Sequence, residues 1–258
     1  MKIAMIGAGA MGGATVEGLI KCESIHNGDI IVSDPSAAVR EKFSVQGVSV
    51  TTDNFQAAQE ADIVCVCVKP WFVEQVLKGI APALNASRKL LVVIAAGIPS
   101  ADIHQWVPNC PPLFLAIPNI AIAHLSSMTF IVPVGASEGQ TAVVKDLFDQ
   151  MGTALLTDEK HLAAGTTLAS CGIAYAMRYI RAASEGGVEI GFKADEAKQI
   201  VMQTLKGAVD LLQASGMHPE QAIDLVTTPG GLTIKGLNEM EHAGFTSSVI
   251  RGLKASLK

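Results

Sequence analysis

The feature that most constrains this chain is a glycine-rich loop near its N-terminus. The letters "GAGAMG" place Gly7, Gly9 and Gly12 between an apolar stretch, 2–6, and a helical pattern, 11–21. Here Gly7 permits a tight turn, Gly9 lets the backbone approach a pyrophosphate, and Gly12 lets the helix pack closely on the sheet. The start of the helix favours the negative charge. We therefore expect the whole loop to contact a dinucleotide: Gly7, Ala8, Gly9, Ala10, Met11 and Gly12.

An acidic residue bears on which dinucleotide binds. The second expected strand, "DIIVSD" (29–34), ends in Asp34, about 20 residues after the loop, where a carboxylate accepts hydrogen bonds from a ribose 2′-OH. The same carboxylate repels a 2′-phosphate, so Asp34 favours NADH. Arg40 lies one or two helical turns further on and can serve a 2′-phosphate, so NADPH stays open.

The first half of the chain alternates between strand and helix patterns. Strands followed by helices predict right-handed βαβ units and a doubly wound parallel sheet of the Rossmann type. The expected strands are 2–6, 29–34, 61–68, 89–96, 113–119 and 127–134, and the expected helices 11–21, 36–43, 72–80 and 101–107.

The second half of the chain reads as helices alone. The stretch 193–216 has an amphipathic pattern, and Gly216 follows it as a C-cap. Two shorter helices are expected in "HPEQAIDLVTT" and "IKGLNEMEHAG". We therefore expect an α/β dinucleotide-binding domain over 1–155 and an all-helical domain over 156–258.

Composition excludes several classes of function. The net charge of −5 leaves no basic excess for phosphates, so no nucleic-acid partner is expected. A membrane-spanning helix needs about 20 apolar residues, and runs such as 90–98 are far shorter. No membrane partner is therefore expected.

Cysteine and histidine usage indicates neither disulfides nor a metal site. The five cysteines are odd in number and form no CxxC, which is typical of reduced core residues in a cytoplasmic protein. The six histidines show neither HxxxH nor HExxH spacing. We expect no metal.

A proline followed by two glycines interrupts the helical half. In "TTPGGLT" we expect Thr228 as an N-cap and Pro229 as the first helical residue. Gly230 and Gly231 then present unpaired N–H groups that can hold a carboxylate, with the Thr233 hydroxyl beside them. A plain turn between two helices explains the same letters equally well.

At this segment the chain resembles a known family. "AIDLVTTPGGLTIKGLNEME" (222–241) resembles the signature segment of the pyrroline-5-carboxylate reductases. Other pieces match in order, and the resemblance spans nearly the whole chain. They are "GAGAMG" (7–12), "VCVKP" (66–70), "VIAAGI" (93–98), "IPN" (117–119) and "EGGVEIGFKADEA" (185–197).

The resemblance implies a Rossmann domain followed by a helical dimerisation domain, and a homodimer or higher homo-oligomer. The implied activity is reduction of the cyclic imine 1-pyrroline-5-carboxylate to L-proline by NAD(P)H, the last step of proline biosynthesis. The resemblance places Thr233 at the imine as the catalytic residue. The implied substrate contacts are Gly230, Gly231, Leu232, Thr233 and Asn119, and the further implied cofactor contacts are Asn54, Lys69 and Pro70.

Two departures from the family pattern keep other functions open. The chain has "PNIA" (118–121) where the family shows Pro-Asn-Thr-Pro, and "ASCGIA" (169–174) where it shows Ser-Gly-Ser-Gly-Pro-Ala. A reductase of a different cyclic imine therefore stays open, as does a non-catalytic nucleotide-sensing protein. A β-hydroxyacid dehydrogenase-like enzyme is the third alternative. It is less favoured, because such an enzyme needs a lysine in "GIAYAMRYIRA" (172–182), which offers Arg178 and Arg181 instead.

Overall fold

The computed structural model describes residues 1–85 and 88–257 and divides into two compact units. The first unit is Met1–Ser170 and the second is Cys171–Lys258. The residues between the expected boundary at 155 and Ser170 pack with the first unit. The division of binding roles between domains 1–155 and 156–258 stays a prediction.

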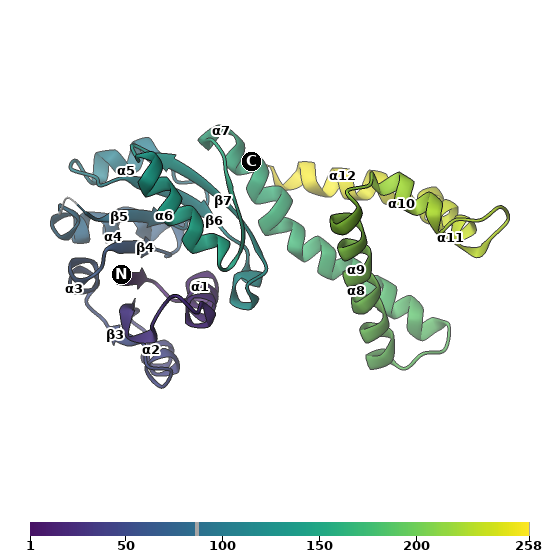
Figure 1. Ribbon diagram of the computed structural model, residues 1–258, viewed down its shortest axis with the longest axis horizontal. Helices are drawn as coiled ribbons and strands as arrows, with labels where there is room; N and C mark the ends of the chain where they lie inside the picture. The colour runs from purple at the N-terminus through teal and green to yellow at the C-terminus, as the bar shows by residue number, and fades with distance from the viewer. Residues whose placement is uncertain (86–87, 258) are drawn as a thin grey trace. The chain divides into compact units, whose positions relative to one another are not determined.

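The first unit is built on one eight-stranded sheet of order β3-β2-β1-β4-β5-β6-β7-β8 (Figure 1). All neighbouring strands run parallel except β6 and β7, which pair antiparallel. The expected doubly wound sheet is thus confirmed, with one antiparallel pair added to it. The strands are β1 Ile3–Ile6, β2 Ile30–Ser33, β3 Ser49–Thr51, β4 Ile63–Val66, β5 Leu90–Val93, β6 Leu113–Ile117, β7 Ser127–Val134 and β8 Gly152–Leu156.

Helices cover both faces of this sheet, as parallel strands require. One buried cluster joins the sheet to α1 (Ala10–Lys21), α2 (Ala37–Ser44) and α6 (Glu138–Asp149). The other joins it to α3 (Asn54–Glu60), α4 (Pro70–Leu84) and α5 (Ser100–Trp106). All four residues of β1, β2, β4 and β5 are buried, which explains why these strands read as continuous apolar runs.

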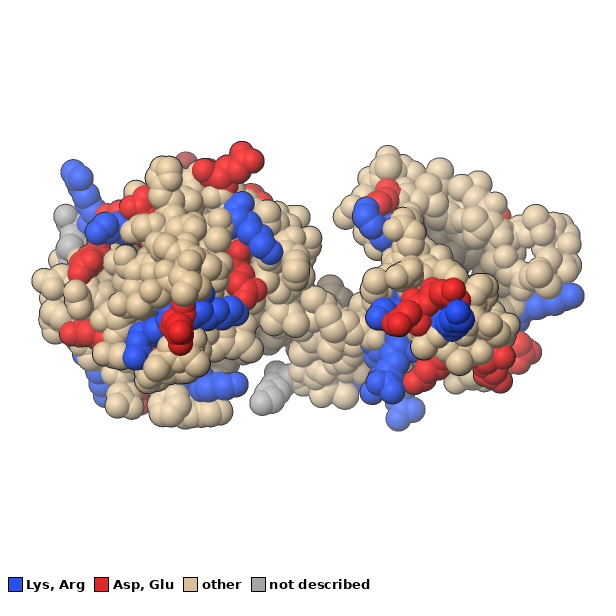
Figure 2. Space-filling view, turned by 90° about the horizontal axis from the view of Figure 1, so that it is seen from below, with Lys and Arg blue, Asp and Glu red and all other residues tan. Residues whose placement is uncertain are grey.

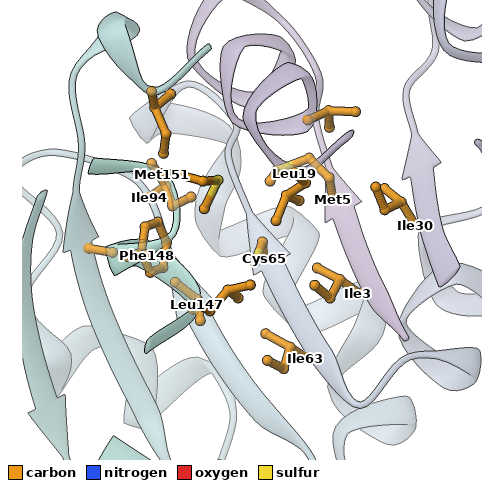
Figure 3. Close-up of a cluster of buried hydrophobic side chains, with 14 of the residues drawn as sticks. Ile3, Met5, Leu19, Ile30, Ile63, Cys65, Ile94, Leu147, Phe148 and Met151 are labelled. Carbon is orange, nitrogen blue, oxygen red and sulfur yellow. The ribbon is translucent and has the colours of Figure 1, made fainter. Parts of the chain in front are cut away.

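Figure 3 shows the first of these clusters in detail. Ile3 and Met5 of β1 lie in one buried layer with Cys65 of β4 and with Leu147 and Phe148 of α6. Burying one such side chain stabilises the fold by about 1.5–3 kcal/mol. The sheet that positions the cofactor loop is therefore held by its own core.

Besides two short 3-10 turns, two strands and two α-helices of this unit were not predicted: β3, β8, α3 and α6. Strand β3 has three residues, none of them buried, and β8 buries only its third residue. Helices α3 and α6 bury two and three residues respectively. The short elements β3, α3 and β8 carry little apolar periodicity, so their sequences resemble loops. Helix α6 is different, since it has 12 residues and buries Val144, Leu147 and Phe148 at helical spacing, so its signal was present in the sequence and was overlooked.

The helices continue from the first unit into the second. Helix α7 (Glu159–Gly165) is followed by a π-helical segment, Thr166–Cys171. The second unit holds α8 Gly172–Glu189, α9 Ala194–Ser215, α10 Pro219–Leu225, α11 Leu232–His242 and α12 Phe245–Ser256. Helix α9 and its C-cap at Gly216, with φ 63°, confirm the expectation for 193–216.

The face of the molecule seen in Figure 2 carries charges of both signs. On the side seen in Figure 2, acidic and basic side chains are interspersed among uncharged ones. Among residues 1–85 and 88–257, no helix combines the length and the apolar character that crossing a membrane requires.

Candidate cofactor and substrate site

The carboxyl ends of six strands, β1 to β6, line two adjoining cavities in the first unit. The cavities measure about 500 and 660 Å³ and share Pro35, Val68 and Phe72 in their walls. The chain reverses its direction of winding between β1 and β4, since β1 lies between β2 and β4. Dinucleotides bind in the crevice at such a switch point.

The glycine loop behaves as its spacing predicts. Gly7 has φ 87°, and a Cβ there would lie 2.5 Å from the Cys67 carbonyl oxygen. A Cβ on Gly12 would lie 2.0 Å from the Gly7 carbonyl oxygen. Both glycines are therefore demanded by the chain's own packing.

Gly9 differs from the other two, because a Cβ there would meet no atom within 4 Å. It is the N-cap of α1 and, because it has no side chain, it makes no side-chain capping hydrogen bond. Gly9, Ala10 and Met11 line the 500 Å³ cavity. Open space above an uncapped helix start fits a bound pyrophosphate.

Asp34 lies beside the loop with both carboxylate oxygens in use. Oδ2 accepts a hydrogen bond from the Ala8 N–H at 2.8 Å, and Oδ1 accepts one from the Ser36 N–H at 2.9 Å. The residue is 8% exposed and lines the 500 Å³ cavity. Arg40 Nη1 donates to the Asp34 backbone oxygen at 2.7 Å. Asp34 thus braces the loop as well as facing the cavity.

Asn54 is the first residue of α3 and lines the 660 Å³ cavity. Its Oδ1 accepts a hydrogen bond from Ser33 Oγ at 2.7 Å, and Asp53 caps the helix. The other end of α3 is held by the buried Lys89, whose Nζ donates to the Ala58 oxygen at 2.8 Å. This clamp fixes Asn54 at the cavity.

Lys69 and Pro70 also reach the crevice, at the start of α4. Lys69 is the N-cap and Pro70 the first helical residue. Both line the 500 Å³ cavity and both are exposed. The structure thus gathers the predicted cofactor residues around one crevice, with Ala8 and Gly12 buried beneath it; their contacts with a cofactor stay a prediction.

Asn119 is 7% exposed and joins three segments. Its Oδ1 accepts from the Ala121 N–H at 3.0 Å, and its own N–H donates to Ser127 Oγ at 3.1 Å. Its Nδ2 donates to the Ala169 oxygen at 3.4 Å. The amide is therefore committed to holding the β6 end against the π-helical segment, and its predicted role in substrate binding stays a prediction.

Two hydroxyl-bearing residues that line the cavity were not predicted from the sequence. Thr166 and Ser170 of the π-helical segment face it together with Ile94, Ile117 and other residues at the ends of β5 and β6. π-helical turns often mark functional sites. The altered "ASCGIA" letters were the available signal, but a π-helix has no recognisable pattern in sequence.

The Pro-Gly-Gly segment differs from its expected form. Helix α11 begins at Leu232 with Gly231 as N-cap, so the prediction of Thr228 as N-cap and Pro229 as first helical residue is wrong. The Gly231 N–H donates to the Thr228 oxygen at 2.9 Å and closes a turn. Gly230 has φ 69°, which suits glycine after proline in a type II turn.

The observed turn determines which backbone N–H groups are available to a ligand. The Gly231 N–H is used inside the turn, whereas the first N–H groups of α11, on Leu232 and Thr233, have no acceptor within the helix. Leu232 is 87% exposed, and Thr233 is exposed beside it. The roles of Gly230, Gly231, Leu232 and Thr233 at a substrate stay predictions.

The cysteines near the crevice are poor nucleophiles. Burial, together with the neighbouring Cys67, raises the pKa of Cys65 to about 12, and burial raises the pKa of Cys67 to about 12. Both thiols stay protonated near neutral pH. Within residues 1–85 and 88–257, no three His, Cys, Asp or Glu side chains converge in a way that could hold a metal ion.

Comparison with family models divides the chain much as its structure does. The model for pyrroline-5-carboxylate reductase dimerisation matches residues 159–258. The model for coenzyme F420-dependent NADP oxidoreductases matches residues 2–97. The two matches cover the glycine loop and the Pro-Gly-Gly turn.

Whole proteins are similar over the full chain. Pyrroline-5-carboxylate reductase 1 of Dictyostelium discoideum is 35% identical over 98% of this chain, which spans only 48% of that relative. Pyrroline-5-carboxylate reductase 2 of the same organism is 32% identical over 99% of this chain and 90% of its own length.

Solved structures agree. The pyrroline carboxylate reductase of Plasmodium falciparum with NADP bound matches with a TM-score of 0.90 at 25% identity, over 100% of this chain and 95% of that one. The 1-pyrroline-5-carboxylate reductase of Streptococcus pyogenes matches with a TM-score of 0.87 at 29% identity, over 100% and 96%.

Proposed function

The chain belongs to the pyrroline-5-carboxylate reductase family, and we propose that it reduces 1-pyrroline-5-carboxylate to L-proline with a nicotinamide cofactor. The observation that carries the proposal is the pairing of two features in one chain. One is a dinucleotide crevice with an open Gly9, and the other is an uncapped helix start after a Pro-Gly-Gly turn.

In this proposal the first unit binds the cofactor. The backbone from Gly9 to Met11 holds the pyrophosphate at the start of α1. Asn54 lies on the adenosine side of the switch point, and Lys69 supplies a positive charge near the phosphates. The apolar ends of β5 and β6 form a wall against which a nicotinamide ring can pack.

The second unit supplies the groups for the substrate carboxylate. The N–H groups of Leu232 and Thr233 point out of the N-terminus of α11, where the helix dipole favours a negative charge. Gly230 keeps the approach open, since a Cβ there would meet no atom within 4 Å. The Thr233 hydroxyl oxygen can accept a hydrogen bond from the N–H of the protonated imine.

The reaction needs no general acid or base among these residues. A reduced nicotinamide supplies a hydride when bound. The protonated imine accepts this hydride at C5, and its nitrogen keeps the proton that it already carries. The chain therefore acts by holding the substrate carboxylate and the ring in place and by excluding water. The Thr233 hydroxyl holds the nitrogen as it becomes an amine.

We propose NADH as the preferred cofactor, with NADPH as the alternative. The Asp34 carboxylate is fixed by two backbone N–H groups and makes no ion pair with any described residue. Its negative charge can accept from a ribose 2′-OH and opposes a 2′-phosphate. The guanidinium of Arg40 stabilises the turn through the Asp34 backbone oxygen instead.

We further propose a homodimer, or a higher homo-oligomer, in the cytoplasm. The helical unit exposes large apolar side chains such as Val209 and Ile250, which are costly to leave in water. All five cysteines are free, which suits a reducing compartment.

The test is turnover by the full chain. Purified protein is mixed with 1-pyrroline-5-carboxylate and NADH or NADPH, and cofactor oxidation and L-proline are measured together. We expect one L-proline for each cofactor oxidised. Faster turnover of another cyclic imine would support the alternative substrate, and a folded protein that binds NADH without turnover would support the nucleotide-sensing alternative.

A further inference from the structure

One end of the 500 Å³ cavity is almost entirely apolar. The carboxyl ends of β5 and β6 contribute Ile94, Ala95, Ala96, Ile117 and Pro118. These strands lie on the side of the switch point opposite to β2 and β3. With the adenosine half over β2 and β3, the nicotinamide half falls at this end.

Among the described residues that line the cavity, two carry a side-chain hydroxyl, and both belong to the π-helical segment. Thr166 Oγ1 already donates to the Leu162 oxygen at 2.7 Å. The Ser170 hydroxyl has no hydrogen-bond partner among the residues that the structure describes. Of these two hydroxyls, that of Ser170 can therefore both donate a hydrogen bond to a ligand and accept one from it.

The backbone that leads into Ser170 is held in place at two points. A Cβ on Gly165 would lie 2.9 Å from the ring of Phe130, so α7 packs directly against β7. Asn119 Nδ2 donates to the oxygen of Ala169, the residue before Ser170. These two anchors fix the π-helical segment against the ends of β6 and β7.

A nicotinamide ring brings one polar substituent, its carboxamide, into this apolar end. A buried amide without a hydrogen-bond partner destabilises the bound state, so a polar group of the protein is expected beside the carboxamide. We propose that Ser170 is a cofactor-positioning residue whose hydroxyl hydrogen-bonds the nicotinamide carboxamide and fixes the rotation of the ring. The inference rests on the proposed use of a nicotinamide cofactor in this crevice.

The experiment measures cofactor binding to the full chain, without any imine. NADH is titrated into the wild type, Ser170→Ala and Ser170→Thr, with Ser126→Ala as a matched control on an exposed loop. The same titrations use two reduced analogues: the 3-acetylpyridine form, which lacks the amide NH₂, and the thionicotinamide form, which lacks the amide oxygen.

We expect Ser170→Ala to weaken NADH binding about 3- to 10-fold, as one lost hydrogen bond implies, and Ser170→Thr to restore it. Ser126→Ala should bind like the wild type. The Ser170→Ala penalty should vanish with one of the two analogues, because the partner atom is then already missing. Which analogue it is identifies whether the hydroxyl accepts from the NH₂ or donates to the oxygen.

Two results would overturn the proposal. One is a penalty of the same size with both analogues, which would indicate a structural effect of the alanine. The other is NADH binding that Ser170→Ala leaves unchanged, which would show that the hydroxyl does not hold the cofactor. Failure of the proposed reduction appears separately, as absent L-proline with cofactor binding intact.

Discussion

The two units of this chain bury their apolar side chains very differently. In Met1–Ser170, whole strands such as β1 are buried, and two apolar clusters cover both faces of the sheet. In Cys171–Lys258, Ala197 is the one buried apolar residue among those described. Large side chains there stay open, among them Ile190 at 78% and Leu225 at 66% exposed.

The difference indicates that the first unit is complete within one chain, whereas the second is not. Five helices without a buried core cannot offset the conformational entropy of ordering them. Another surface must cover their apolar side chains, and the match to a dimerisation model over 159–258 makes a second copy the natural candidate. Cofactor binding should then depend on one chain and catalysis on the assembly.

The largest expected effect comes from a charge in the helical unit. Val209 of α9 is 51% exposed, and in a dimer we expect it to be covered. Val209→Asp would bury an unpaired carboxylate, which costs on the order of 4 kcal/mol, or about a thousandfold in the dimer dissociation constant. Light scattering at micromolar concentration should show monomer.

The matched control is Gln203→Asp on the same helix, where an exposed polar side chain is replaced. This variant should keep the size of the wild type. A wild type that is itself monomeric would contradict the claim that a second copy covers the helical unit.

The next largest effect concerns the substrate turn. Thr233→Val keeps the β-branched shape and removes only the hydroxyl. We expect kcat/KM for the imine to fall about 5- to 150-fold, or roughly 1–3 kcal/mol, with the KM for the cofactor nearly unchanged.

Thr204→Val is the matched control, because the Thr204 hydroxyl only donates to the Ile200 oxygen within α9. Its kinetics should match those of the wild type. Normal kinetics with a lower Tm in Thr233→Val would instead assign that hydroxyl to stability and remove Thr233 from the active site.

A smaller effect is expected at Asp34, inside the self-contained unit. Asp34→Ala removes the acceptor for a ribose 2′-OH and also the brace on the Ala8 N–H. We expect NADH binding to weaken about 10-fold, roughly 1.4 kcal/mol, and any preference over NADPH to narrow. Asp34→Asn keeps one acceptor oxygen, so its affinity for NADH should lie between those of the wild type and of Asp34→Ala. A wild type that strongly prefers NADPH would refute this interpretation of Asp34.

The smallest effect is a pH-dependent one on stability. Partial burial raises the pKa of the Asp149 carboxyl, but hydrogen bonds from Lys145 and from the Ala154 N–H at 2.7 Å outweigh this and lower the pKa. A lowered pKa stabilises the folded state above the ordinary value of 3.8, and the gain is lost as the pH falls through the folded pKa.

Asp149→Asn should therefore reduce the free energy of unfolding at pH 7 by less than about 1 kcal/mol, since the pair is partly exposed. The difference in the free energy of unfolding between the variant and the wild type should disappear below about pH 4. Urea titrations at pH 7 and below pH 4 can check this. The loss should not depend on protein concentration, in contrast to Val209→Asp. A gap that persists at low pH would exclude the carboxylate as its cause.

The same contrast explains what the sequence could predict. Gly7 and Gly12 are required by contacts with the backbone of the same chain, and β1 is buried in the core of the same unit. The local sequence was therefore enough to predict the glycine loop and this strand. The Thr228 cap was wrong because Gly230 adopts φ 69° and moves the helix start to Leu232. The exposed side of α9 is expected to be covered by residues of another chain. The pattern of a single sequence does not identify those residues.

Residues of the crevice show a similar limit. Asp34 was predicted from its position at a strand end, and Lys69 only through the family resemblance. Ser170 was not predicted, because it reaches the cavity through a π-helical turn that leaves no periodic signal. The antiparallel run of β7 also escaped prediction, since an apolar strand reads alike in both directions.

The most direct test compares the full chain with a fragment of residues 1–170. NADH binding and turnover of 1-pyrroline-5-carboxylate are measured on both. We predict that the fragment binds NADH as the full chain does and produces no L-proline, while the full chain produces one L-proline for each NADH oxidised. Turnover by the fragment, or a folded full chain that binds NADH and forms no L-proline, would contradict the account.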